Sequence, residues 1–76
     1  MSMTELTIRY VLLLESLGRT SRSNLPYAVK AEAIEALEDN KRRLEREIAE
    51  ELGCEDTRDL RFLEWVREVS EARRSA

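Results

Sequence analysis

Only three residues of this chain strongly interrupt a helix, namely Gly18, Pro26 and Gly53. Proline favours the first turn of a helix, and glycine favours the position just after the last turn. All three residues stand where helix boundaries would be expected, and the stretches between them contain no breaker. We therefore predict an all-α fold, with residues 1–76 forming one helical domain.

Capping signals divide the chain into three helices. Ser2 and Glu5 form a capping-box pattern at the start of the first helix. Gly18 is expected to end that helix as a left-handed residue, and Asp56 or Thr57 is expected to cap the third. The predicted elements are a helix over about 3–17, a polar linker over 18–25, a helix over about 26–52 and a helix over about 57–73.

Each predicted helix carries an apolar stripe with the 3.6-residue period of an amphipathic helix. The stripe residues are Leu6, Tyr10, Leu13, Leu14 and Leu17 on the first helix, Ile34, Leu37, Leu44, Ile48 and Leu52 on the second, and Phe62, Trp65, Val66 and Val69 on the third. We expect the second and third helices to form an antiparallel hairpin, with the first helix packed across it.

The first helix has apolar residues on a second side as well. Ile8, Val11 and Leu12 point away from its main stripe. Three short helices rarely supply enough material to surround one of them, so we interpret these residues as an apolar surface for another protein or a second copy. The alternative is that the other two helices clasp the first on both sides.

Acidic residues accumulate at the end of the second helix, where the helix dipole disfavours negative charge. Glu47, Glu50 and Glu51 belong to this group and could form a charged rim that orients a partner. The alternative is a solvated surface that keeps a small protein soluble. The same helix is long and has a polar break at Asn40 and Lys41, which fits either pairing with a second copy or a snorkelling lysine.

Basic residues suggest the alternative function, a small nucleic-acid-binding regulator. The candidates are Arg19 and Arg22 near the linker and Arg42 and Arg43 on the second helix. Arg42 and Arg43 each follow an acidic residue by four positions, which is the spacing of helix-surface ion pairs. Because residues 25–53 carry five basic and eight acidic side chains, we do not expect nucleic acid to be the partner.

Composition argues against an enzyme and against a bound cofactor or metal. The chain has no histidine, which removes the usual general base and the commonest metal ligand. Its single cysteine, Cys54, can form no intrachain disulfide, and this favours a reducing cytoplasm. Neither a signal-peptide pattern nor an apolar run long enough for a membrane is evident. We therefore expect a non-catalytic, cytoplasmic adaptor, subunit chaperone or inhibitor that binds another protein, a second copy of itself, or both.

Overall fold

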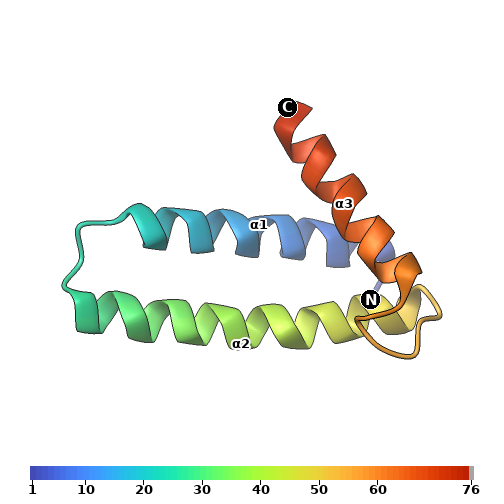
Figure 1. Cartoon of the computed structure of the whole chain (residues 1–76), viewed down its shortest axis with the longest axis horizontal. Helices are drawn as coiled ribbons and strands as arrows, with labels where there is room; N and C mark the ends of the chain where they lie inside the picture. Colours follow the sequence, from blue (N-terminus) through green and yellow to red (C-terminus); the bar gives the residue numbers. More distant parts are fainter. Residues whose placement is uncertain (76) are drawn as a thin grey trace.

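The computed structural model describes residues 1–75 and consists of three α-helices (Figure 1). The helices are α1 (Met3–Arg22), α2 (Tyr27–Glu51) and α3 (Leu60–Ser75). No strand occurs within the described residues. The predicted all-α, three-helix fold is therefore confirmed, and two of its helix boundaries and one helix pairing differ from prediction.

Helix α1 begins as predicted and ends later. The Ser2 hydroxyl accepts a hydrogen bond of 3.2 Å from the backbone N–H of Glu5, as an N-cap should. The predicted end at Gly18 is wrong, because α1 continues to Arg22. One glycine inside a helix costs only about 1 kcal/mol relative to alanine. The helix instead ends where both the N–H and the hydroxyl of Ser23 donate to the carbonyl of Thr20.

Helix α2 follows the prediction to within one residue at each end. Pro26 immediately precedes it, and Gly53 follows with a φ of 77°. The Gly53 N–H donates to the Glu50 carbonyl at 3.0 Å, and the Cys54 N–H donates to the Ala49 carbonyl at 2.8 Å. These two bonds are those of a Schellman motif, which requires a left-handed residue after the helix. The predicted stop at Gly53 is confirmed.

Helix α3 begins three residues later than predicted, and its cap is Asp59. The Asp59 carboxylate accepts a bond of 2.9 Å from the Arg61 N–H, and the Asp59 carbonyl accepts the first helical bond from Leu63. Asp56, a predicted cap, instead accepts from the N–H of Arg58 within the preceding turn. Asp, Ser and Thr compete for such roles over short distances, so neighbouring cap candidates in one loop are hard to rank.

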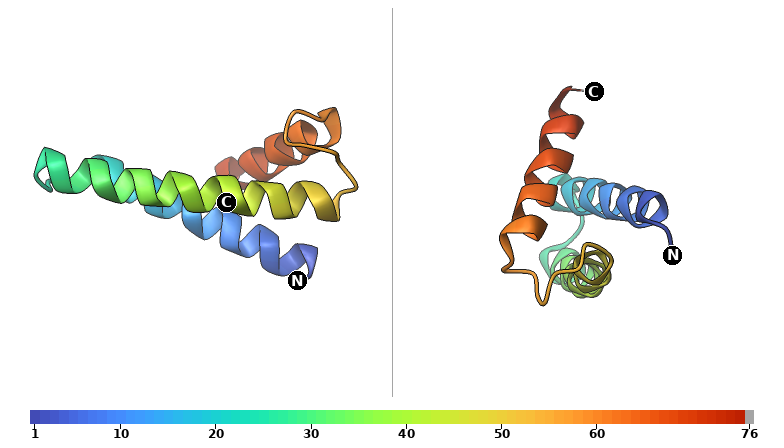
Figure 2. Two further views of the ribbon diagram at one scale, coloured as in Figure 1. Left: turned by 90° about the horizontal axis from the view of Figure 1, so that it is seen from below. Right: turned by 90° about the vertical axis from the view of Figure 1, so that its right-hand side faces the viewer.

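The long antiparallel hairpin is formed by α1 and α2, and α3 crosses one end of it (Figure 1, Figure 2). The predicted hairpin of α2 with α3 is therefore not confirmed. Extension of α1 to Arg22 leaves only residues 23–26 as the turn before α2, and so short a connection favours antiparallel neighbours. The connection to α3 spans residues 52–59, and α3 leaves α2 at a steep angle (Figure 2).

The core lies where the three helices meet. Its buried residues are Leu6, Tyr10, Ile48, Ala49, Cys54, Phe62 and Val69. Trp65 is half-buried against them, with its ring centroid 5.3 Å from Tyr10 and 6.1 Å from Phe62. Such aromatic contacts add to the burial of apolar area that fixes α3 on the hairpin.

Candidate functional site

The outer face of α1 exposes two large apolar side chains. Ile8 and Leu12 stand four residues apart, and each keeps 54% of its surface accessible. Residues four apart lie on one face of a helix, and the face that carries Leu6 and Tyr10 is already buried in the core. The sequence predicted an uncovered apolar surface at Ile8 and Leu12, and the structure confirms that these side chains are exposed.

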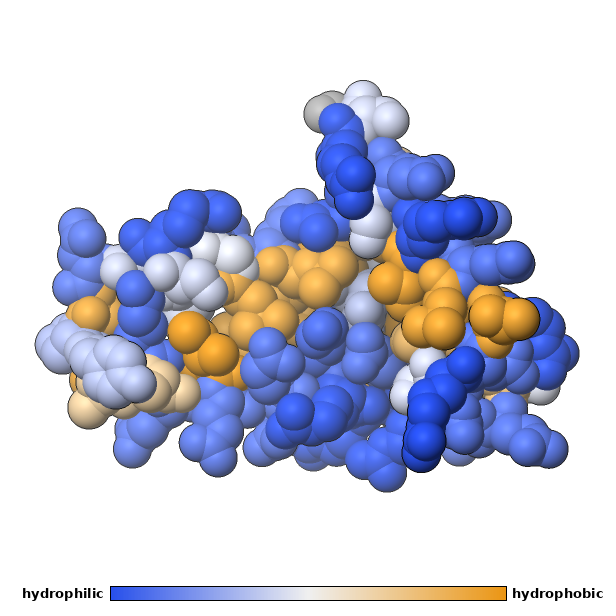
Figure 3. Space-filling view, viewed as in Figure 1, coloured by the Kyte–Doolittle hydropathy of each residue, from blue (hydrophilic) through white to orange (hydrophobic). Residues whose placement is uncertain are grey.

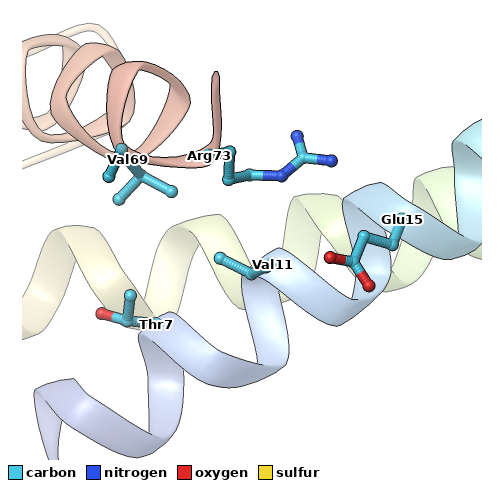
Figure 4. Close-up of a pocket in the computed structure, with 6 residues that line it drawn as sticks. Thr7, Val11, Glu15, Val69 and Arg73 are labelled. Carbon is cyan, nitrogen blue, oxygen red and sulfur yellow. The ribbon is translucent and has the colours of Figure 1, made fainter. Parts of the chain in front are cut away.

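Val11, the third residue of that predicted surface, has a different environment. It is half-buried and lines a groove between α1 and α3 of about 380 Å³, together with Thr7, Ala72 and Val69. Figure 4 shows Val11 and Val69 directed into the space between the two helices. Ile8 precedes Val11 by three positions, so the groove adjoins the outer face. The outer face and the groove therefore form one continuous apolar region.

Charged side chains flank the open end of this groove. Glu15 extends from α1 and Arg73 from α3, on opposite sides of the gap (Figure 4). The same two residues also border a second depression, of about 280 Å³, which is lined further along α1 by Arg19 and Arg22. The groove therefore passes from an apolar floor to a basic end.

The three residues predicted to form a charged rim lie away from the outer face of α1. Glu47, Glu50 and Glu51 are exposed on α2, and they line a depression with Met1 and Leu6. Neither this depression nor the groove at Val11 is lined by residues of both groups. The structure thus brings the glutamates to the start of α1 and does not bring them to the predicted apolar surface. No signal within the sequence specifies this placement, because it depends on how α1 and α2 pair.

Several exposed apolar residues were not assigned to any site by sequence reasoning. Tyr27, at the start of α2, is 86% exposed, and Leu25 and Val29 beside it are exposed as well. Leu60 and Leu63, in the first turn of α3, are 75% and 49% exposed. A signal for the last two was present, since both stand to one side of the stripe of Phe62, Trp65, Val66 and Val69.

The basic residues of the alternative function do not gather into one patch. Arg19 and Arg22 lie in the last turns of α1, whereas Arg42 and Arg43 lie in the second half of α2. Arg42 pairs with Asp39, and the Arg43 guanidinium donates to the Asn40 side chain at 2.6 Å. These partners are three residues away. None of the predicted pairs four residues apart forms an ion pair among the described residues.

A side-chain hydrogen bond connects α1 with α2. The Tyr10 hydroxyl donates a hydrogen bond of 2.8 Å to the carboxylate of Glu45, which joins α1 to α2. Burial of the phenol raises the pKa of Tyr10 well above its usual value, and the bond to Glu45 raises it further. Cys54 is a free thiol buried in the core. Over residues 1–75, no group of three or more acidic or cysteine side chains is placed to hold a metal ion.

The fold leaves apolar side chains exposed on all three helices, and on α1 they adjoin the groove lined by Val11 and Val69. No helix among the described residues has an apolar stretch of the length that crossing a bilayer requires. Comparison with known proteins found no matching family model, no similar curated protein and no similar solved structure.

Proposed function

We propose that this protein is a non-catalytic helical interaction module that binds another protein through the outer face of α1. The observation that carries the proposal is the exposure of Ile8 and Leu12 side by side on α1, next to a groove floored by Val11 and Val69. Singly exposed apolar residues are normal on protein surfaces, whereas grouped ones mark binding sites.

The mechanism is burial of this apolar region against a partner. An apolar side chain of the partner that enters the groove would be shielded from water by Val11 and Val69. Ile8 and Leu12 would pack against the partner's flanking surface. A large apolar side chain that becomes fully buried in this way contributes about 1.5–3 kcal/mol to the free energy of binding. Glu15 and Arg73 at the open end of the groove would then set the orientation of the bound segment.

Binding through this face is compatible with the role of an adaptor, a subunit chaperone or an inhibitor. The second group of predicted residues, Glu47, Glu50 and Glu51, would supply a separate acidic contact beside Met1. A cytoplasmic site of action is part of the proposal, and the buried free thiol of Cys54 is compatible with a reducing compartment.

Nucleic-acid binding has weaker support as the alternative. The chain carries a net charge of -3, and Arg42 and Arg43 bond to side chains of their own helix. A protein that binds duplex DNA would instead present a continuous basic face to phosphates. A gel-shift titration at low salt separates the two functions, since a shift of duplex DNA or RNA would favour the alternative.

Site-specific photo-crosslinking in the native cells tests the proposed function. A photoreactive amino acid at position 12 should give a covalent adduct of discrete mass with another protein. The same probe at Glu35, an exposed residue of α2, serves as the matched control and should give no such adduct. Adding Ile8→Glu should abolish the adduct at position 12. Identical products from positions 12 and 35, or no product from position 12, would refute the proposal.

A further inference from the structure

Helix α3 buries its apolar side against one half of the hairpin, and its last turn, at Arg73, borders the other half without burying a residue there. Within residues 1–75, every buried residue belongs to the segments 6–10, 48–54 and 62–69, which meet at the end occupied by α3. None of the residues 11–47 is buried. Among the apolar residues of the other half, Leu13, Leu17, Ile34 and Leu37 are only half-buried, and Leu25, Tyr27 and Val29 are exposed. Figure 3 shows an apolar band along the seam between α1 and α2 that runs well beyond α3. We call residues 13–37 the turn half of the hairpin.

The accessible surface of the chain is larger than that of a compact monomer. A folded protein of 8.9 kDa is expected to expose about 4800 Å², whereas this chain exposes 5652 Å². The excess, roughly 850 Å², is close to the ~800 Å² that each partner buries in a protein interface of standard size. The radius of gyration, 13.5 Å, also exceeds the ~11 Å expected for a compact domain of this length.

Helix α3 has a second apolar side that its own hairpin does not use. Phe62 and Val69 face the core. On a helical projection, Leu60 and Leu63 lie more than a quarter-turn away from that side, and both are exposed. A helix that is apolar on two sides is suited to a position between two layers. The first layer is the hairpin of the same chain.

Charge is distributed unevenly along the hairpin. The end next to the turn, residues 16–34, carries Arg19, Arg22 and Lys30 against the single acid Glu32. The opposite end, residues 44–59, carries seven acidic and two basic side chains. Among the described residues, the only ion pairs are those of Arg42 with Asp39 and Arg61 with Asp59. The charges at the two ends are therefore left mostly unpaired within one chain.

We propose that a second copy of this chain covers the turn half of the hairpin, with the two copies antiparallel about a two-fold axis. In this arrangement the α3 helix of each copy lies between the two hairpins. Leu60 and Leu63 of one copy then pack on the turn half of the other. The acidic end of each copy faces the basic end of its partner, because the two hairpins run in opposite directions.

A second copy fits these surfaces better than an unrelated protein because each open surface finds its complement on the same chain. The uncovered seam matches the unused side of α3, and the basic end matches the acidic end. About a two-fold axis, the contact of α3 with the seam and the contact of the acidic end with the basic end each form twice. Such symmetry gives a closed dimer. The inference goes beyond the proposed function and uses other residues, since Ile8 and Leu12 remain free on the outer face of α1.

Sedimentation velocity on the whole chain across a concentration series tests the proposal. The unmodified protein should be a dimer, and Leu60→Glu with Leu63→Glu should raise the dissociation constant at least about a hundredfold. Both residues are exposed in one chain, so the helical circular dichroism of that variant should be unchanged. Ile8→Glu with Leu12→Glu is the matched control and should leave the dimer intact. A monomer at every concentration, or a dimer indifferent to the changes in α3, would overturn the proposal.

The control also separates this proposal from the proposed function. If Ile8→Glu with Leu12→Glu dissociates the dimer as strongly as the changes in α3 do, the copies associate through α1 and the arrangement proposed here is wrong. If it abolishes the cellular adduct and leaves the dimer intact, the two surfaces act independently, as we expect. Loss of the adduct therefore reports on one proposal and loss of the dimer on the other.

The relative direction of the two copies can be measured with spin labels. A label at Asn24→Cys, in a Cys54→Ala background, lies in the exposed turn between α1 and α2. Antiparallel copies place the two labels at opposite ends of the dimer, at a distance comparable with or longer than the 40 Å length of one chain. A parallel dimer would place the labels side by side, and a distance well below that length would overturn the antiparallel arrangement.

Discussion

The hydroxyl of Tyr10 and the carboxylate of Glu45 are joined by a hydrogen bond of 2.8 Å between α1 and α2. The ring of Tyr10 also lies against Trp65 of α3 in a tilted arrangement, so this residue of α1 contacts both other helices. Its position next to the crossing of α3 makes it the link between the hairpin and the third helix. The phenol is buried, and its only polar atom is satisfied by Glu45.

Replacing Tyr10 with phenylalanine should destabilise the protein by about 1–2 kcal/mol, because the change removes a hydrogen bond to a charged acceptor and leaves the ring in place. Urea unfolding at pH 7 measures this difference. A variant as stable as the unmodified protein would show that the bond between α1 and α2 makes no net contribution.

The same bond predicts a dependence on alkaline pH. Burial and the bond to Glu45 raise the pKa of Tyr10 in the folded protein, while an unfolded tyrosine titrates near pH 10. Above pH 10 the unfolded state therefore loses its proton first, and stability falls by up to about 1.4 kcal/mol per pH unit. Below pH 10 both states keep the proton, and this contribution is fully present. The difference in stability between the unmodified protein and Tyr10→Phe should shrink as the pH rises from 10 to 11.5.

The two glycines should respond in opposite directions to alanine. Gly18 lies inside α1, and a Cβ there would meet only the flexible guanidinium of Arg22, at 3.4 Å. Gly18→Ala should therefore stabilise the protein by about 0.4–1 kcal/mol. Gly53 has a φ of 77°, and Gly53→Ala should destabilise it by about 1–2 kcal/mol. Thermal unfolding of the two variants gives the comparison, and equal shifts of the same sign would contradict it.

These glycines also show how far the sequence predicts the fold. A glycine is compatible with a helix interior and with a helix end, and the choice depends on the hydrogen bonds that its neighbours can make. At Gly53 the chain closes a Schellman motif. At Gly18 the helix continues, and it ends at Ser23, whose hydroxyl donates to the Thr20 carbonyl. Local patterns therefore predicted three helices and their apolar faces, and misplaced the ends of two.

The pairing of the helices could not be read from the stripes, since an apolar face does not specify its partner. Exposure of Ile8 and Leu12 was predictable because both stand off the main stripe of their helix. Val11 stands off it too, and it is half-buried only because α3 crosses at that point. Glu47 and Met1 line the same depression because α1 and α2 pair in antiparallel fashion. That pairing is a property of the tertiary structure, so the sequence pattern could not predict it.

Substitution of two isoleucines, one in the core and one on the proposed binding face, should have different effects on stability. Ile48 is fully buried and Ile8 is 54% exposed. Ile48→Ala should destabilise the protein by about 2–5 kcal/mol, because it removes apolar contacts and leaves a cavity. Ile8→Ala should change stability by no more than about 0.5 kcal/mol, since alanine is the better helix former and little burial is lost. Denaturant titration of both variants measures the contrast. A large loss with Ile8→Ala would show that this face is packed within the chain and is not free for a partner.

Helix α3 should detach from the hairpin before the hairpin unfolds when its main anchor is removed. Phe62 is buried and stacks with Trp65, while α3 contacts the hairpin at one end only (Figure 1). Phe62→Ala removes contacts that are worth about 3–5 kcal/mol, and regions with few buried contacts open first. Because Trp65 is the only tryptophan, its fluorescence reports the docking of α3 alone.

In Phe62→Ala, the fluorescence change of Trp65 should therefore occur at a lower urea concentration than the loss of helical circular dichroism. Phe62→Leu is the matched control, because it keeps an apolar side chain at this position and should hold the two transitions closer together. Coincident transitions in Phe62→Ala would mean that α3 and the hairpin unfold as one cooperative unit. In that case the contacts of Tyr10 with Trp65, and of Val69 with the hairpin, would be sufficient to couple them.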